Sequence, residues 1–133
     1  MKQVVVDTSV IIAIIANEPK KQRLLELTAE VDLIAPYSVH WEVGNAITNR
    51  FKRKTWVLAD AIRAMSIYEQ IPISFVDINI TESLKIAYQF NHYAYDAYVV
   101  QCALNYQIPV ISLDKGLIQL AKQMNVTVME VVL

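Results

Sequence analysis

The chain has 133 residues, of which 55% are hydrophobic and 19% charged, and its formal net charge at pH 7 is −1. This length is typical of one domain, here 1–133, that buries roughly two-thirds of its surface, and the balanced charge argues against an indiscriminate nucleic-acid binder. The two glycines, Gly44 and Gly116, are too few and too far apart for a Walker loop or a dinucleotide fingerprint, so phosphate binding by a glycine-rich loop is excluded.

Short apolar runs that end at a polar residue or a proline alternate with helical patterns along the chain. Strands are predicted at residues 4–6, 33–35, 73–76, 109–113 and 126–132. Helices are predicted at residues 10–16, after Pro19, from Ser38 through Arg50, at 57–68, from Thr81 onward, at 95–106 and at 117–124. Ser9 and Ser38 are the expected N-caps of the first and third helices.

This alternation of strands and helices is typical of α/β domains. It predicts three layers, α/β/α, around a mainly parallel sheet of about five short strands, with residues 126–132 as an edge strand. The helix at 95–106 is apolar on both sides, which predicts a central position. We find no internal repeat, linker or second domain in the sequence.

The single cysteine, Cys102, excludes a disulfide within the chain and a site built from several thiolates. The longest apolar stretch, residues 10–16, is too short to span a bilayer. Asp7 interrupts the apolar run near the N-terminus, and no small-residue cleavage pattern follows, so this run does not resemble a signal peptide. We therefore expect a soluble cytoplasmic protein with no membrane association.

Four acidic residues fall where elements of the predicted fold begin or end. Asp7 and Asp114 directly follow strands, Asp96 opens the central helix, and Glu42 lies near the start of its helix. Strand ends and helix starts meet at the carboxyl edge of a parallel sheet, which is where such folds place their ligands. We therefore expect the four carboxylates to converge on one edge.

Convergence of carboxylates has a chemical consequence. Carboxylates within a few ångströms of one another repel, which raises their pKa values unless a cation is present. A set of oxygen ligands without His or Cys favours Mg²⁺ or Mn²⁺ over Zn²⁺. Helix N-termini at the same edge favour a phosphate. Together these features are what metal-assisted hydrolysis of a phosphodiester bond requires.

Each acid taken singly also has a structural interpretation. Asp7 is compatible with a capping turn, Asp96 with a favourable helix-dipole charge, and Asp114 with a turn. Glu42 is harder to explain in this way, because Asn45 follows it by one turn and both have apolar neighbours in the sequence. The metal-site hypothesis depends on all four acids coinciding at one edge.

The acids lie in four sequence blocks whose order and spacing are specific: VVVDTSVIIAI, APYSVHWEVGNAI, HYAYDAYVVQCA and PVISLDKGL. In these blocks the chain resembles the PIN-domain ribonucleases, and most closely the VapC-type toxins of bacterial and archaeal toxin–antitoxin modules. The resemblance covers essentially the whole chain. It implies a PIN-like three-layer fold and cleavage of RNA by metal-activated water.

The resemblance also assigns roles to individual residues. It implies that the catalytic, metal-binding acids are Asp7, Glu42, Asp96 and Asp114. It implies a supporting role, in positioning water or phosphate, for Thr8, Ser9, Asn45 and Ser112. A further acid that some relatives carry a few residues after the fourth is Leu117 here, which weakens any outer metal site.

The implied partners follow from the same resemblance. They are an RNA substrate, a second copy of the chain in a homodimer, and a small protein antitoxin whose tail wraps the toxin and blocks the acidic edge. Antitoxins of this kind often insert an arginine or a lysine among the acids in place of the metal.

Basic and aromatic side chains outside the acidic edge each allow two interpretations. The densest basic run is equally compatible with a track for the RNA backbone and with a solvated helix end; it comprises Arg50, Lys52, Arg53 and Lys54. Tyr93, Tyr95 and Tyr98 are compatible with stacking on an unpaired base or with packing, and packing is favoured for Tyr98. Core, interface or surface packing is expected for four other rings: Trp41, Trp56, His40 and His92.

Three rival functions were weighed against the ribonuclease. A haloacid-dehalogenase-like phosphatase needs an acid where Ser9 stands, and a receiver domain needs a second acid beside Asp7, where Val5 and Val6 stand. The remaining alternative is a non-catalytic PIN-fold module that binds RNA or protein, against which the presence of all four acids argues. The sequence therefore predicts a Mg²⁺- or Mn²⁺-dependent endoribonuclease, the toxin of a type II toxin–antitoxin system.

Overall fold

The computed structural model describes residues 2–132, and its centre is a parallel sheet of four strands in the order β3-β2-β1-β4. The strands are β1 (Lys2–Val6), β2 (Val31–Pro36), β3 (Ile73–Val76) and β4 (Val110–Ile111). In the register, Val4 is opposite Leu33 on one side of β1, and Val5 is opposite Val110 on the other. Every pairing is parallel, so all four strands end at the same edge of the sheet.

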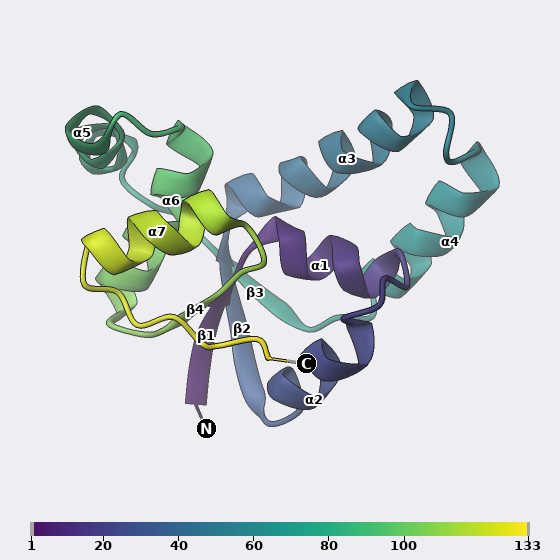
Figure 1. The fold of residues 1–133 in the computed structure, drawn as a ribbon, viewed down its shortest axis with the longest axis horizontal. Helices are drawn as coiled ribbons and strands as arrows, with labels where there is room; N and C mark the ends of the chain where they lie inside the picture. The colour runs from purple at the N-terminus through teal and green to yellow at the C-terminus, as the bar shows by residue number, and fades with distance from the viewer. Residues whose placement is uncertain (1, 133) are drawn as a thin grey trace.

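Helices surround this sheet in the predicted three-layer α/β/α arrangement (Figure 1). They are α1 (Thr8–Ile15), α2 (Lys21–Thr28), α3 (Tyr37–Lys52), α4 (Leu58–Tyr68), α5 (Ile80–Phe90), α6 (Ala94–Tyr106) and α7 (Lys115–Gln123). The helix α6 contacts β1, β2 and β4, and α3 contacts β2 and β3. The far half of α3 extends beyond the sheet, and α4 returns from its end (Figure 1).

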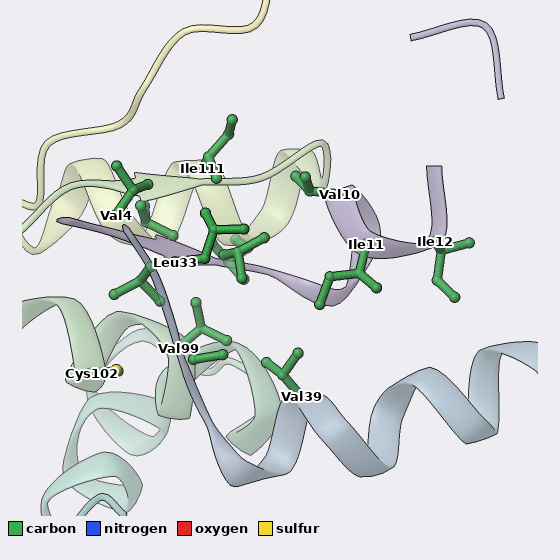
Figure 2. Packing of buried hydrophobic residues seen from close by; sticks show 14 of the residues in the cluster. Val4, Val10, Ile11, Ile12, Leu33, Val39, Val99, Cys102 and Ile111 are labelled. Atoms are coloured by element: carbon green, nitrogen blue, oxygen red, sulfur yellow. The ribbon is translucent and has the colours of Figure 1, made fainter. Parts of the chain in front are cut away.

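The core consists of apolar strand residues packed against buried residues of the surrounding helices. Val4, Leu33 and Ile111 from the sheet lie opposite Val39 of α3 and Val99 of α6, as Figure 2 shows. The expected central position of α6 is confirmed, because its buried residues lie on several sides of the helix: Ala97, Val99, Val100, Cys102 and Ala103. Burial raises the pKa of the Cys102 thiol to about 12, so this cysteine is an inert part of the core.

Both predicted serine caps are wrong. The helix α1 begins at Thr8, and its N-cap is Asp7, whose side chain accepts a hydrogen bond from the Ser9 backbone. The helix α3 begins at Tyr37, directly after Pro36, so Ser38 lies inside the first turn. Proline fixes its own φ and lacks an N–H group, so it stops β2 and starts the helix earlier than the serine does.

The predicted edge strand at 126–132 is also wrong. Only an isolated parallel bridge forms there, between Val110 and Val128. Its hydrogen bonds join Val110 N to Thr127 O at 2.9 Å and Met129 N to Val110 O at 2.8 Å. The strand β4 has only two residues, so it offers too short an edge for a longer ladder, and the sheet has four strands rather than about five. No helix within residues 2–132 is both long and apolar enough to cross a membrane.

Candidate metal-binding active site

Asp7 stands at the carboxyl end of β1, where it is only 6% exposed. Its Oδ2 accepts two hydrogen bonds from hydroxyl groups, one from Ser9 Oγ at 2.6 Å and one from Ser112 Oγ at 2.8 Å. Burial raises the pKa of Asp7, and the two hydroxyls partly oppose this shift. The carboxyl group is therefore fixed in orientation and costly to ionise in the absence of a cation.

The segment after β4 is tied to the segment after β1 by the same two serines. Ser9 Oγ accepts a hydrogen bond from Leu113 N at 2.9 Å, and Ser112 Oγ accepts one from Asp114 N at 3.0 Å. Asp114 then caps α7, since its Oδ1 accepts hydrogen bonds from the backbone of Gly116 and the residue that follows. These bonds hold two strand ends together, as the sequence predicts for a shared edge.

Glu42 lies in the second turn of α3 and is half-buried. Thr8 Oγ1 donates a hydrogen bond to Glu42 Oε1 at 3.3 Å, which links α3 to the start of α1. The pKa of Glu42 is raised to about 7, first by burial and then by the charge of Asp7, with smaller contributions from Asp96 and Asp114. A carboxyl group with this pKa exchanges its proton near neutral pH.

Asp96 lies in the first turn of α6, and its side chain is 18% exposed. Its pKa is raised to about 6 by burial and by the charges of Asp114 and Asp7, while His92 opposes the shift. His92 Nδ1 lies 3.1 Å from Asp96 Oδ2. The structure thus places Asp96 within electrostatic reach of two other acids from remote segments.

The four acids meet at one edge, but they are not closed around a common point. Within residues 2–132, no three or more Asp, Glu, His or Cys side chains are arranged to hold a metal ion. The donor chemistry nevertheless fits a hard divalent cation, because the ligands are oxygens and three carboxyl groups have raised pKa values.

The predicted supporting residues divide into two groups. Thr8, Ser9 and Ser112 form hydrogen bonds to the acids or to one another, as described above. Asn45 is exposed, so it is not the buried polar group that its apolar neighbours in the sequence suggested. Asn45 instead lines a cleft beside Glu42.

His92 is a candidate site residue whose role the sequence analysis missed. Besides its contact with Asp96, its Nε2 lies 3.1 Å from the carbonyl oxygen of Gly116 in α7. The side chain is 19% exposed, so it is not a surface residue. His92 lies before the first residue of α6, so helical spacing in the sequence does not indicate its contact with Asp96.

A cleft of about 400 Å³ opens beside Glu42. Its lining residues come from α1, α3 and α6: Thr8, Trp41, Glu42, Asn45, Ala46, Asn49 and Tyr95. Trp41 is 72% exposed and Tyr95 is 55% exposed, so neither is a core residue. The half-buried position of Tyr98 agrees with the packing role expected for it.

The basic run at the end of α3 is not uniform. Arg50 NH2 lies 3.3 Å from Glu18 Oε1, and its guanidinium carbon lies 5.0 Å from the centre of the Trp56 ring. Lys52, Arg53 and Lys54 are exposed. Only these last three are placed to meet a ligand in solution.

Comparison with known proteins agrees with this arrangement. The family model of the PIN domain matches residues 4–123. PAE2754 from Pyrobaculum aerophilum superposes with a TM-score of 0.69 at 19% identity, over 91% of this chain and 81% of that chain. No curated protein sequence matches the chain.

Two further solved structures superpose on nearly the whole chain. VapBC2 from Rickettsia felis, solved with a fragment of its promoter DNA, superposes with a TM-score of 0.66 at 12% identity, over 96% of this chain and 97% of that chain. FitAcB from Neisseria gonorrhoeae superposes with a TM-score of 0.61 at 16% identity, over 96% of each chain. At these identities the likeness shows a shared fold.

Proposed function

Because this chain belongs to the PIN-domain family, we propose that it is a Mg²⁺- or Mn²⁺-dependent endoribonuclease that acts as the toxin of a toxin–antitoxin pair. One observation carries the proposal. Carboxyl groups from remote segments lie close together at the carboxyl edge of the sheet, where burial and the charge of Asp7 raise the pKa values of both Glu42 and Asp96. Such a cluster is unfavourable for folding alone and is compensated by a divalent cation.

The roles of the residues follow from their contacts. Asp7, Glu42, Asp96 and Asp114 supply the oxygen ligands. A bound divalent cation supplies charge neutralisation for the phosphate and a nucleophilic water at neutral pH. Thr8 donates a hydrogen bond to Oε1 of Glu42, so Oε2 is the oxygen left to bind the metal ion or to accept a proton.

Orientation of the first acid is the task of two serines. Ser9 and Ser112 both donate to Oδ2 of Asp7, so its Oδ1 is the oxygen left for ligation. A carboxylate held in this way loses little side-chain entropy on binding an ion. The backbone links through Leu113 and Asp114 extend the same rigidity to the fourth acid.

The proposal includes a protein partner and a cytoplasmic location. VapBC2 and FitAcB are similar to this chain over nearly its whole length, which supports an antitoxin partner. A basic side chain from that partner would neutralise the acids in place of the ion. For the proposed homodimer, the exposed apolar stripe Ile80, Leu84 and Tyr88 on α5 is a suitable surface.

A non-catalytic module that binds RNA or protein remains the second candidate. The observation in its favour is that no three potential ligands within residues 2–132 are grouped around one point. The two functions make different predictions about metal: a binding module binds its target equally well in chelator and leaves it intact.

The decisive experiment is cleavage of a labelled RNA by the purified chain, freed of any partner. Cleavage is expected with Mg²⁺ or Mn²⁺ and not with excess chelator. Asp7→Asn and Glu42→Gln are expected to abolish it, while Glu82→Gln, which changes an exposed acid on α5, leaves it intact. Cleavage that persists in chelator, or in the two site variants, contradicts the proposal and indicates a contaminating nuclease.

A further inference from the structure

The cleft beside Glu42 follows the axis of α3. Trp41, Asn45 and Asn49 line it at intervals of four residues, so they lie on one side of the helix. Eight residues of helix span about 12 Å. The cleft therefore begins at a proposed catalytic acid and runs away from it along the helix, over a length suited to a small part of a polymeric substrate.

Two aromatic side chains from different helices line this cleft. Trp41 belongs to α3 and Tyr95 to α6, and both are more than half exposed. Each makes an edge-to-face contact with a neighbouring ring: the ring centres of His40 and Trp41 are 4.9 Å apart and those of Tyr98 and Tyr95 are 5.8 Å apart, with interplanar angles of 71° and 87°. These contacts restrict the two rings, and the high exposure of both residues leaves ring surface open to solvent.

The polar groups of the cleft are mostly neutral. Asn45 and Asn49 are exposed and contribute amide groups, each of which both donates and accepts hydrogen bonds. Glu42 is the only charged residue of the lining. A ligand that matches two aromatic rings and two amides is flat, uncharged and edged with hydrogen-bonding groups, which describes a nucleobase.

We propose that this cleft binds one unpaired base of the RNA, next to the phosphate that is cleaved. Trp41 and Tyr95 stack on the base, and the amides of Asn45 and Asn49 bind its edge. The inference rests on the proposed ribonuclease function and makes the substrate single-stranded RNA, because a paired base offers neither its faces nor its pairing edge.

The chain carries two tryptophans, Trp41 and Trp56, which makes stacking directly observable. An Asp96→Asn protein, which does not cleave, is titrated with a short unstructured RNA while tryptophan fluorescence is recorded. Quenching is expected; Trp41→Phe in the same background removes it, and Trp56→Phe preserves it. A duplex of the same sequence produces no quenching.

Kinetics with the otherwise unaltered chain provide the second readout. Trp41→Ala is expected to raise KM about 5- to 100-fold with little change in kcat, as for loss of one stacked base. Trp41→Phe retains a ring and restores most of the binding. Tyr106→Ala, which removes an exposed ring at the far end of α6, serves as the control and leaves KM unchanged.

Three results would overturn the inference while leaving the proposed function intact. They are cleavage by the unaltered chain with KM insensitive to Trp41→Ala, quenching that persists in Trp41→Phe, and quenching by duplex equal to that by the single strand. If the cleft binds a protein partner and not RNA, the KM for RNA does not change in Trp41→Ala. Failure of the proposed function is distinct, because the unaltered chain then cleaves no RNA at all.

Discussion

His92 joins two of the four acidic segments. Its Nδ1 lies 3.1 Å from Oδ2 of Asp96 in α6, and its Nε2 lies 3.1 Å from the carbonyl oxygen of Gly116 in α7. Asp114 caps α7 by accepting a hydrogen bond from the backbone of the same glycine. The imidazole therefore sets the position of Asp96 relative to Asp114.

Replacing His92 should lower the affinity for the metal ion and have a smaller effect on the stability of the fold. We expect His92→Ala to lower activity about 10- to 100-fold at limiting Mg²⁺, as for other residues that orient a metal-binding side chain without contacting the ion. Rates measured against Mg²⁺ concentration should show a raised apparent metal constant. His40→Ala is the matched control, because His40 bonds to Tyr68, outside the acidic edge, and should leave the metal constant unchanged. Equal metal constants for unaltered protein and His92→Ala contradict the orienting role.

Ser112 should affect both stability and activity, because its hydroxyl bridges two acids. It donates to Asp7 Oδ2 and accepts from the backbone N–H of Asp114. Ser112→Ala leaves both partners short of a hydrogen bond, which should cost about 1–2 kcal/mol of unfolding free energy. Thermal melts and RNA cleavage assays check this, with Ser74→Ala on exposed β3 as the control. A variant with unaltered melting temperature and rate would show that the bridge is dispensable.

Glu42→Gln should stabilise the metal-free protein while removing activity. Glutamine keeps the oxygen that accepts from Thr8 and removes a charge that burial and Asp7 disfavour. Solvent screens this half-buried group, so we expect a gain of about 1 kcal/mol, or about 3 °C in melting temperature, in chelator at pH 8. Glu82→Gln, on the exposed face of α5, should leave the melting temperature nearly unchanged. A clear loss of stability in Glu42→Gln would instead assign Glu42 a structural role.

The metal-free protein should become less stable as the pH rises from about 4.5 to about 7. In this window the folded chain retains a proton on Glu42, whose pKa is about 7, whereas the unfolded chain has released it at an ordinary pKa of 4.5. Asp96 acts in the same direction, between about 3.8 and about 6. Melts in chelator at pH 5 and pH 8 test the sign, and Mg²⁺ should restore stability at pH 8. A melting temperature equal or higher at pH 8 in chelator contradicts it.

The acidic edge could be predicted because it follows from chain order alone. Asp7 and Asp114 directly follow strands, and in a parallel sheet such positions share an edge whatever the packing details. Asp96 is likewise fixed by the start of α6. These three positions need only the element boundaries, which the apolar runs supply.

Features that depend on neighbours remote in sequence could not be predicted. The role of His92 requires the carbonyl of Gly116, which lies 24 residues away and belongs to another helix. The exposure of Asn45 depends on which elements pack against α3, whereas the periodicity of the sequence indicates only that a helix forms. The absence of a ladder at 126–132 depends on the shortness of β4, since apolar alternation in one strand cannot indicate the length of its partner.

The structure also separates the members of the basic run by the direction they face. Arg50 is engaged with Glu18 and Trp56. Lys52 and Arg53 follow Asn49 by three and four residues, which places them on the cleft side of α3. An RNA strand that left the proposed base-binding cleft along α3 would therefore meet these two charges and not Arg50.

RNA binding by a double variant, Lys52→Ala with Arg53→Ala, should be weaker and less dependent on salt. Each lost phosphate contact reduces the slope of log affinity against log salt by about 0.7, so about 1.4 is expected for both. Arg50→Ala should instead lower unfolding free energy by about 1 kcal/mol and leave the salt slope unchanged, because its charge is already paired and stacked. Binding of labelled RNA to an Asp96→Asn background across a salt series measures all three slopes. Arg50→Ala could instead change the slope of log affinity against log salt as much as the double variant does. All basic residues at the end of α3 would then contribute equally to RNA binding, and the cleft would not determine the path of the RNA strand.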